Sequence, residues 1–278
     1  MPELPEVTTI VNDLEPRVVN RRIVGIDILW PGTIVHPDPE DLQGRLMGQP
    51  IVGVRRRAKL IVIDLASGDR LVVHLRMTGR LLLRPAEAEP DQFVRVVFRL
   101  DDGQQLRLAD ARKFGSVKLM ASAEFEKLSE SLGREPLGPD FALERFREML
   151  GGRGARIKPL LLDQTFLAGM GNIYVDEALF ESGIHPARRA SSLGEAEVAR
   201  LYQAIRHVLQ EGIKDRGTTF ISYVDAYGRR GGHQFNLKAY RRAGDPCPRC
   251  ATAIQRIVVG GRGTYICPRC QALTPAAA

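Results

Sequence analysis

The chain of 278 residues contains four cysteines, arranged as two Cys-Pro-Arg-Cys pairs with sixteen residues between the pairs. The tight turn of each pair directs two thiolates to one point, and two such pairs complete a tetrahedral site for one zinc ion. We therefore predict one structural Zn²⁺ held by Cys247, Cys250, Cys267 and Cys270. A site closed by four protein ligands leaves no open position for catalysis. Two disulfides are the alternative, disfavoured because this basic chain starts without a secretion-type leader.

The residues between the two cysteine pairs have the pattern of a β-hairpin. Apolar runs over 253–259 and 264–266 flank the segment Gly260-Gly-Arg-Gly263, which predicts a turn at the end of the hairpin far from the metal. Arg262 would then lie at the tip of a rigid, metal-braced hairpin. A guanidinium held there, with glycines that allow close approach, suits a phosphate group. An ordinary solvated turn arginine is the alternative.

A second candidate for chemistry is the N-terminus, Met1-Pro2-Glu3. Initiator methionine is commonly removed before proline, which would leave a secondary amine at Pro2. An α-amine has a pKa of roughly 8, so part of it is unprotonated at neutral pH. Such an amine can attack an electrophilic sugar carbon to form an iminium, with Glu3 as its acid–base partner. The alternative is an ordinary first helical turn, where proline and acidic residues are common.

Two further segments are candidates for a functional role. The glycines at 169 and 171 precede a helix that we expect to begin near Asn172, with Asn172 as its cap, and a glycine-flanked helix start can bind an anion. A capped turn in a helical bundle is the alternative. The Gly/Arg/aromatic loop over 217–232 has little apolar periodicity, and a loop of this length is more often functional or mobile than a passive linker.

Composition limits the class of partner. The chain has 40 Lys and Arg against 33 Asp and Glu, a net charge of +7, and a pI near 9.5. This balance favours a polyanion, nucleic acid first, over a small acidic metabolite. No apolar run approaches the roughly eighteen residues of a membrane span. We expect a cytoplasmic, monomeric protein that contacts no membrane.

The elements that must position these residues follow from apolar periodicity. Residues 5–20 have helical spacing of Val7, Ile10, Val11 and Leu14. Short apolar or alternating runs then predict the strands of an antiparallel sandwich, over 22–29, 51–57, 60–65, 70–75, 94–100, 105–108 and 116–120. Residues 123 to about 214 have a helical pattern, with helices over 143–150, 157–162, 173–181 and 195–213. The predicted class is a multidomain α+β fold.

Several motifs occur together and in order along nearly the whole chain. They are Met1-Pro-Glu-Leu-Pro-Glu-Val7, Arg56-Arg-Ala-Lys59, His74-Leu-Arg-Met-Thr-Gly79, Asp110-Ala-Arg-Lys-Phe-Gly115, Leu162-Asp-Gln164 through Met170-Gly-Asn-Ile-Tyr174, and the four-cysteine ribbon. This combination resembles the bacterial formamidopyrimidine-DNA glycosylases (8-oxoguanine DNA glycosylase/AP lyase). The resemblance implies a base excision repair enzyme that acts on damaged double-stranded DNA. Such an enzyme removes oxidised purines (8-oxoguanine and formamidopyrimidines) through a Schiff base on its N-terminal proline, then cleaves the strand by β,δ-elimination.

The resemblance also implies roles for single residues. Pro2 is the nucleophile, Glu3 a proton donor, Lys59 a second one, and Arg262 assists the last elimination through a phosphate. A base must leave the duplex before its glycosidic carbon can be reached. The residues implied to contact DNA are the void fillers Met77, Arg112 and Phe114, and the phosphate contacts Arg153, Lys158 and Asn172. Without the accompanying motifs, Met77 and Phe114 would suggest core residues and Arg112 a solvated charge.

The same resemblance divides the chain into three domains. It implies a catalytic domain over 1–130, made of the leading helix and the β-sandwich. A helix–two-turn–helix DNA-binding domain with a lesion-capping loop would follow over 131–238, and the zinc ribbon over 239–278. Two positions depart from the family pattern. Thr8 stands where glutamate is frequent, and Pro90-Asp-Gln-Phe93 stands where a DNA-contacting His-Asp-His-like motif is usual.

Two other functions remain open at this point. A sister enzyme of the endonuclease VIII kind uses the same nucleophile on oxidised pyrimidines. Leu4, the pair Met77 and Phe114, and the long 217–232 loop favour the purine enzyme. A non-catalytic zinc-ribbon DNA-binding protein would explain the charge and the cysteines, but it would leave Pro2 and Glu3 without a role.

Overall fold

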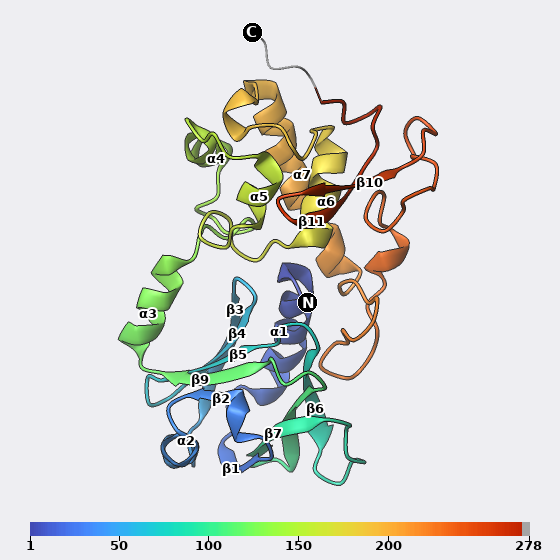
Figure 1. Cartoon of the computed structure of the whole chain (residues 1–278). Coiled ribbons are helices and arrows are strands. Elements are labelled where there is room, and N and C mark those ends of the chain that lie inside the picture. Colours follow the sequence, from blue (N-terminus) through green and yellow to red (C-terminus); the bar gives the residue numbers. More distant parts are fainter. Residues whose placement is uncertain (274–278) are drawn as a thin grey trace. The chain divides into compact units, whose positions relative to one another are not determined.

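The computed structural model describes residues 1–273, which belong to two compact units (Figure 1). The first unit comprises residues 1–131 and 212–234, and the second comprises 132–211 and the chain from 235 onward. The first contains a helix and a β-sandwich, and the second contains helices and the cysteine-bearing hairpin. The predicted α+β class, with its sandwich and its ribbon, is confirmed. None of the helices described has the length and apolar character needed to span a membrane.

Two sheets form the sandwich of the first unit. One has the strand order β1-β7-β8-β6 and the other β2-β9-β5-β4-β3. All neighbouring strands are antiparallel except β2 and β9, which are parallel. The strands are β1 (Ile23–Ile28), β2 (Ile34–His36), β3 (Ile51–Arg57), β4 (Leu60–Leu65), β5 (Arg70–His74), β6 (Gly79–Pro85), β7 (Val94–Leu100), β8 (Gln104–Asp110) and β9 (Ser116–Met120).

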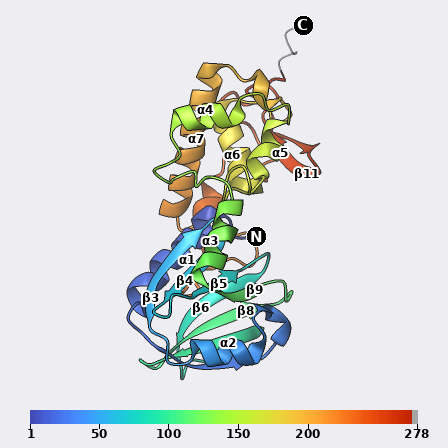
Figure 2. The same cartoon turned by 90° about the vertical axis from the view of Figure 1, so that its left-hand side faces the viewer.

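One apolar core joins both sheets to helix α1 (Leu4–Val18). Side chains alternate across each strand, so Ile61 and Ile63 of β4 enter this core together with Leu106 and Leu108 of β8. Val62 points to the opposite face of its sheet, where it packs with Phe125 of α3 (Ser122–Ser131). Figure 2 shows α3 across this face of the five-stranded sheet. The five-stranded sheet is therefore packed on both faces, against the apolar core on one and against α3 on the other.

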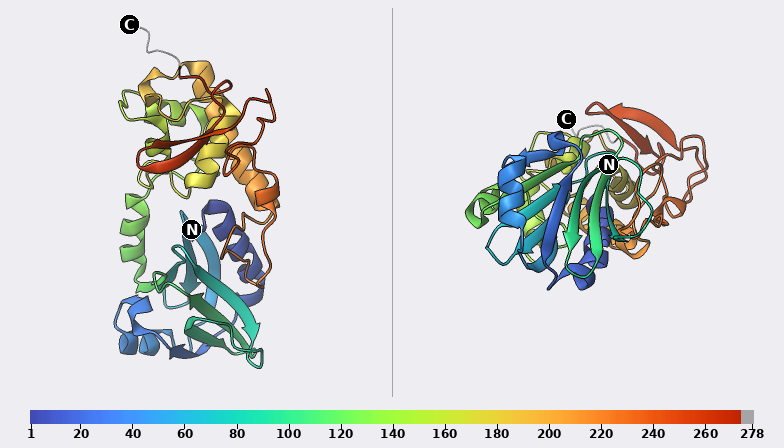
Figure 3. Two further views of the ribbon diagram at one scale, coloured as in Figure 1. Left: turned by 45° about the vertical axis from the view of Figure 1, so that its right-hand side comes forward. Right: turned by 90° about the horizontal axis from the view of Figure 1, so that it is seen from below.

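The second unit is built on four helices and one hairpin. The helices are α4 (Leu143–Leu150), α5 (Ile157–Leu162), α6 (Asn172–Ser182) and most of α7 (Glu195–Lys214), whose last residues belong to the first unit. Phe180 of α6 packs against Cys247, Cys267 and Ile254 of the ribbon. Figure 3 shows the hairpin of β10 (Gln255–Val259) and β11 (Arg262–Ile266) beside α6. The ribbon thus shares its core with a helix.

A short helix, α2 (Pro39–Leu46), and three 3-10 turns at 31–33, 190–192 and 233–235 complete the regular structure described. Helix α2 begins at a proline, and the side chain of Asp38 caps it by accepting the N–H groups of Glu40 and Asp41. Loop 217–232 packs as part of the first unit. The three-domain division remains a prediction.

Candidate active site and zinc centre

The start of α1 holds the predicted nucleophile in a fixed backbone. Glu3 is the N-cap residue: its carboxylate accepts the N–H of Glu6, and its own N–H donates to Glu6 Oε2 at 2.8 Å. The second carboxylate oxygen of Glu6 accepts the N–H of Thr218 at 2.7 Å. Pro2 and Glu3 are buried, whereas Met1 is half exposed. The nitrogen of Pro2 is an amide while Met1 is attached, so chemistry at this atom requires removal of Met1.

Lys59 lies in the two-residue turn between β3 and β4, and it is 6% exposed. Its neighbour Ala58 has a left-handed backbone, with φ of +52°. Arg56 supports this turn by donating to the carbonyl of Ala58 at 2.9 Å, and its Nε donates to Thr8 Oγ1 of α1 at 3.0 Å. The arginine therefore ties the lysine turn to the helix that starts at the proposed nucleophile. Thr8, the departure from the family pattern, is the acceptor in this link.

His74 ends β5 directly beside the lysine turn, because it pairs with Leu60 in the sheet register. Its Nδ1 accepts the N–H of Arg76 at 2.9 Å. Burial, together with the positive charges of Arg76 and Lys59, lowers the pKa of His74 to about 4. The imidazole is therefore neutral at physiological pH.

The three predicted void fillers lie together on two loops of the first unit. Met77 and Phe114 are 46% and 52% exposed, and Arg112 is exposed as well. The guanidinium of Arg112 lies 3.3 Å from Met77 Sδ and 4.7 Å from the centre of the Phe114 ring. Cation–π contact of this kind keeps the arginine and the ring together. The result is one exposed apolar and cationic tip, which we call the wedge (Met77, Arg112, Phe114).

The loop over 217–232 is fixed at its base and exposed at its tip. Arg216 donates to Asp13 of α1 at 2.6 and 2.8 Å, and to Asp225 at 2.6 Å. Burial alone would raise the pKa of Asp225. Hydrogen bonds from Arg216, Arg229 and Tyr227 outweigh burial and hold this pKa below its ordinary value. Ile221 at the tip is 84% exposed. These bonds hold the start and the middle of the loop against α1, while the apolar side chain of Ile221 remains exposed.

In the second unit, Lys158 has an environment that its sequence motif does not reveal. Its side chain is fully buried, and its Nζ lies 2.6 Å from Asp176 Oδ1, 2.8 Å from Thr264 Oγ1 and 3.2 Å from the carbonyl of Gly263. Burial raises the pKa of Asp176, and the ammonium of Lys158 opposes that shift. Direct contact between Lys158 and phosphate remains a prediction. The ammonium contacts protein acceptors on α6 and β11.

Asn172 and Asp176 of α6 contact the same strand. Asn172 Nδ2 donates to the carbonyl of Gly263 at 2.9 Å, and Asp176 Oδ2 accepts the N–H of Tyr265 at 3.0 Å. The expectation that Asn172 caps α6 is wrong: Gly171 occupies the N-cap position, and Asn172 is the first helical residue. Its amide is directed to β11 instead. We call this set of bonds from Lys158, Asn172 and Asp176 the β11 brace.

The two remaining predicted phosphate contacts are exposed. Arg262 begins β11, paired with Val259 beside a two-residue turn whose glycines, Gly260 and Gly261, both have positive φ. Arg153 lies in the loop after α4, with its guanidinium 5.6 Å from the centre of the Phe166 ring. Both guanidinium groups therefore have the exposure that phosphate binding needs.

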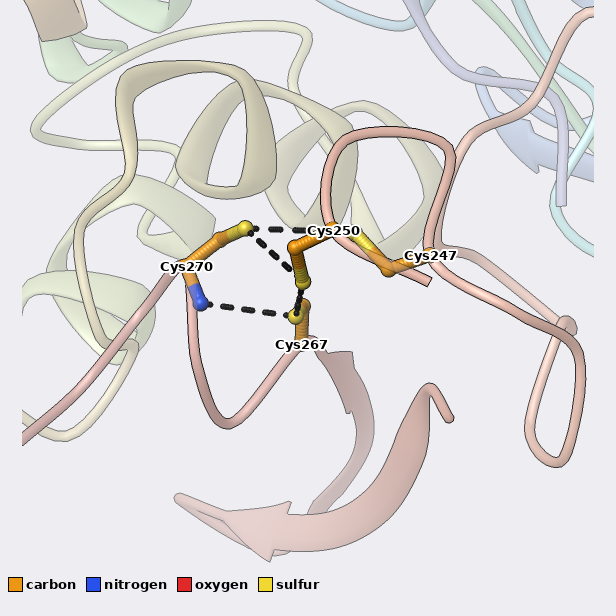
Figure 4. A group of neighbouring side chains, drawn as sticks. All are labelled: Cys247, Cys250, Cys267 and Cys270. Atoms are coloured by element: carbon orange, nitrogen blue, oxygen red, sulfur yellow. Dashed lines mark hydrogen bonds between the residues drawn. The ribbon is translucent and has the colours of Figure 1, made fainter. Parts of the chain in front are cut away.

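The four cysteines converge as the sequence predicts (Figure 4). Their ligand atoms all lie within 4.8 Å of one another. Sulfur–sulfur distances are 3.4 Å for Cys250–Cys267, 3.5 Å for Cys250–Cys270 and 3.9 Å for Cys247–Cys270. Four thiolates at the usual zinc–sulfur distance of about 2.3 Å are about 3.8 Å apart in a tetrahedron. These separations fit Zn²⁺ and are far longer than the about 2 Å of a disulfide.

Comparison with known families divides the chain into three matched stretches. Residues 1–117 match the formamidopyrimidine-DNA glycosylase N-terminal domain, and residues 132–223 match the formamidopyrimidine-DNA glycosylase H2TH domain. Residues 244–273 match a zinc finger found in FPG and IleRS. With the converging thiols, this last match identifies the cysteine cluster as a structural site for one zinc ion.

Full-length relatives give the same result. The chain is 47% identical over 273 residues to a formamidopyrimidine-DNA glycosylase of Herpetosiphon aurantiacus. The alignment covers 98% of this chain and all of the relative. Another, from Pelotomaculum thermopropionicum, is 45% identical and covers 98% of this chain and 99% of the relative.

Solved structures of similar proteins include complexes with DNA. Lactococcus lactis Fpg (MutM) bound to N7-benzyl-Fapy-dG DNA aligns with a TM-score of 0.90 at 37% identity, covering 98% of this chain and all of that one. The same protein bound to oxidised-pyrimidine DNA aligns with a TM-score of 0.89 at 37% identity and the same coverage. From its full-length matches and its three matched domains, this chain belongs to the formamidopyrimidine-DNA glycosylase family.

Proposed function

We propose that this protein is a bifunctional DNA glycosylase and AP lyase of base excision repair that removes oxidised purines. The observation that carries this proposal is the arrangement at the start of α1. A buried Pro2 precedes a glutamate fixed by reciprocal capping, and Arg56 ties the same helix to the turn that bears Lys59. An N-terminal amine with acidic and basic groups on neighbouring elements suits attack on a sugar carbon.

The proposed reaction begins once Met1 has been removed. The lone pair of the Pro2 nitrogen forms a bond to C1′ of the damaged nucleotide. The bond from C1′ to the base breaks, and the base leaves with a proton supplied by the protein. The Pro2 nitrogen then loses its proton, and its lone pair forms the C=N bond as the C1′–O4′ bond of the sugar ring breaks. Glu3 is the proposed proton donor to O4′ of the opened sugar, and Lys59 is proposed as the second proton donor. The product is an iminium between Pro2 and the sugar.

The iminium then promotes strand cleavage. Loss of a proton from C2′ expels the 3′ phosphate by β-elimination, and a second elimination expels the 5′ phosphate. Arg262, exposed at the start of β11, is proposed to stabilise a departing phosphate. Its guanidinium offers paired N–H donors that match phosphate oxygens.

DNA binding is proposed to use insertion of the wedge of the first unit and phosphate contacts of the second unit. The wedge would enter the space left by the flipped base, and Arg153 would contact a phosphate directly. Lys158 and Asn172 are proposed to support binding through the β11 brace, because both hold the strand that begins with Arg262. The zinc site fixes the same hairpin from its other end.

The test of this function is single-turnover cleavage of matched duplexes. One duplex carries 8-oxoguanine opposite cytosine, a second carries thymine glycol, and a third is undamaged. We expect base release and strand cleavage on the first, and much slower release on the second. Faster release of thymine glycol would favour the endonuclease VIII-like alternative. The observation behind this alternative is that a Lactococcus lactis relative has been solved with oxidised-pyrimidine DNA. DNA binding without release from any duplex would favour a non-catalytic protein.

The remaining parts of the proposal concern the molecule as a whole. We propose that it acts as a monomer in the cytoplasm. We also propose three functional domains, over 1–130, 131–238 and 239–278, with the zinc ribbon as the last of them.

A further inference from the structure

A buried carboxylate that the proposed mechanism does not use lies beneath the wedge. Asp110 ends β8 and is 1% exposed. The hydroxyl of Thr78, the residue after Met77, donates to its Oδ1. The N–H of Arg112 donates to the same oxygen at 3.1 Å. Its Oδ2 accepts the N–H of Phe114 at 2.8 Å and that of Gly115 at 2.6 Å. One side chain thus bonds to both loops that carry the wedge.

We propose that Asp110 is a positioning residue that holds Met77, Arg112 and Phe114 as one preformed wedge. Each wedge loop contains a non-glycine residue in the left-handed region, Arg76 at φ +51° and Lys113 at φ +59°. Such residues persist only where their surroundings over-determine the backbone. Asp110 constrains the second loop through its backbone N–H groups and the first through the hydroxyl of Thr78, while the tips of the wedge remain exposed. His74 adds to the constraint on the first loop by accepting the N–H of Arg76.

The charge of Asp110 supports the same role. Burial alone would raise its pKa, but the bonds from Thr78 and from the N–H groups of Gly115, Arg112 and Phe114 outweigh burial and lower it. The carboxylate of Asp110 is therefore ionised at physiological pH, and both of its oxygens accept hydrogen bonds. An amide in its place would present an N–H₂ group to other N–H donors, so Asp110→Asn removes part of the constraint with almost no change in volume.

This inference rests on the proposed function, because it assumes that the wedge enters DNA. A wedge is needed for extrusion of an intact, stacked base, and much less where no base has to be unstacked. Asp110→Asn should therefore slow base release from a duplex with 8-oxoguanine opposite cytosine. It should have little effect on the nicking of a duplex with a preformed abasic site.

Asp102→Asn provides a matched control. Asp102 lies in the turn before β8, at the other end of the strand from Asp110, and its carboxylate accepts the N–H of Gln104 at 3.1 Å. It is also a turn-organising carboxylate of the same unit, but it has no bond to either wedge loop among those described.

Two measurements decide the matter. The first compares rates on the two substrates: we expect Asp110→Asn to lose about tenfold or more in base release, as expected for lost hydrogen bonds to a charged group. Its nicking of abasic DNA should stay within about threefold of the parent, and Asp102→Asn should match the parent in both. Equal losses of Asp110→Asn on both substrates would show general destabilisation and overturn the proposal, as would an unchanged rate of base release.

The second measurement needs no chemistry. 2-Aminopurine is placed opposite a tetrahydrofuran abasic analogue, and its fluorescence is recorded at saturating protein. We expect the parent and Asp102→Asn to change the fluorescence, and Asp110→Asn to bind but lose most of that change. The parent's full signal from Asp110→Asn would overturn the inference, as would the absence of any signal from the parent. A parent that gives the signal but releases no base would refute the proposed enzymatic function and leave the positioning role standing.

Discussion

At the scale of single residues, Arg56 connects the turn of the proposed proton donor Lys59 to helix α1. Arg56 bridges Thr8 of α1 and the carbonyl of Ala58, so the turn bearing Lys59 is placed by a helix far from it in sequence. The family's frequent glutamate at position 8 would give this arginine a charged acceptor, and threonine gives a neutral one. His74 remains uncharged at neutral pH, so it adds no further positive charge to those of Lys59 and Arg76 beside it.

The lowered pKa of His74 predicts a pH dependence of stability. Histidine has a pKa near 6.5 in an unfolded chain, and that of folded His74 is about 4. Between these values the unfolded chain binds more protons, so this contribution is fully present above pH 6.5 and is lost as the pH falls towards 4. Allowing for partial exposure, the loss should be roughly 1–2 kcal/mol. Urea unfolding between pH 4.5 and 7.5 measures it.

His74→Asn is the control for this prediction, since asparagine can still accept the N–H of Arg76. The free energy of unfolding of the variant should vary less with pH over the same range. Burial also lowers the pKa of His185 in the second unit, so part of the slope should remain. An identical slope in the parent and in His74→Asn would show that His74 does not titrate as described.

Among the elements, β11 is held more firmly than its sequence suggests. Three side chains from α5 and α6 bond to its backbone and to Thr264, and the turn glycine Gly260 lies so close to Pro159 that an added Cβ would be 2.7 Å from that ring. Because Arg262 is the first residue of this strand, its backbone position depends on the brace. Helices α5 and α6 therefore help to position Arg262, the proposed phosphate contact, through the strand that it begins.

Removing one partner of the brace should be costly. Lys158→Met would leave Asp176 buried without its cation, at a cost of about 3–5 kcal/mol, whereas Lys158→Met with Asp176→Leu should recover most of that loss. Thermal unfolding of the two variants measures the difference. At temperatures where both are folded, Lys158→Met should leave the slope of log K against log salt for DNA binding unchanged, because a buried ammonium releases no phosphate counterion.

Arg262→Ala is the comparison variant, since an exposed phosphate contact should flatten that slope by about one unit. If Lys158→Met flattened the slope by the same amount while its stability equalled that of the parent, Lys158 would be a direct phosphate contact. The brace would then have no part in its effect on binding.

The sequence predicts most strands and helices because their residues alternate or recur at helical spacing, as in 51–57, 143–150 and 157–162. It misses β6, where Leu81, Leu82 and Leu83 form an unbroken run bounded by arginines. It also misses two short elements, β2 with three residues and α2, which has eight residues and starts at a proline. The cysteine site follows from spacing alone. Hydrogen bonds between residues far apart in sequence cannot be predicted in this way. The bond between Lys158 and Thr264, 106 positions away, has no local sequence signal.

At the scale of the whole molecule, zinc and the apolar cores support different parts of the chain. The sandwich has its own core, whereas the ribbon contributes a small cluster around the cysteines and Phe180. Small ribbons derive much of their folding free energy from metal binding. The two parts should therefore respond differently to loss of the metal.

Cys250→Ser tests this division. We expect the variant to lose zinc and to nick abasic DNA at least tenfold more slowly, because the strand that starts with Arg262 loses its anchor. The β-sheet signal in circular dichroism should persist. Zinc content, circular dichroism and nicking rates are the measurements, with Arg262→Ala as the variant that keeps zinc but slows strand cleavage. A zinc-free Cys250→Ser protein that nicks at the parent rate would contradict the role given to the ribbon.

The central claim is that the Pro2 nitrogen forms the covalent bond to DNA, and borohydride trapping tests it most directly. The protein is prepared with a cleavable leader before Pro2, so that the nitrogen is an amide before cleavage and a free amine after it. Both forms are incubated with 8-oxoguanine duplex and sodium borohydride, and the adduct is located by mass spectrometry. We predict an adduct on Pro2 only after cleavage of the leader. A full yield of adduct from the uncleaved form, or an adduct on a lysine, would contradict the account.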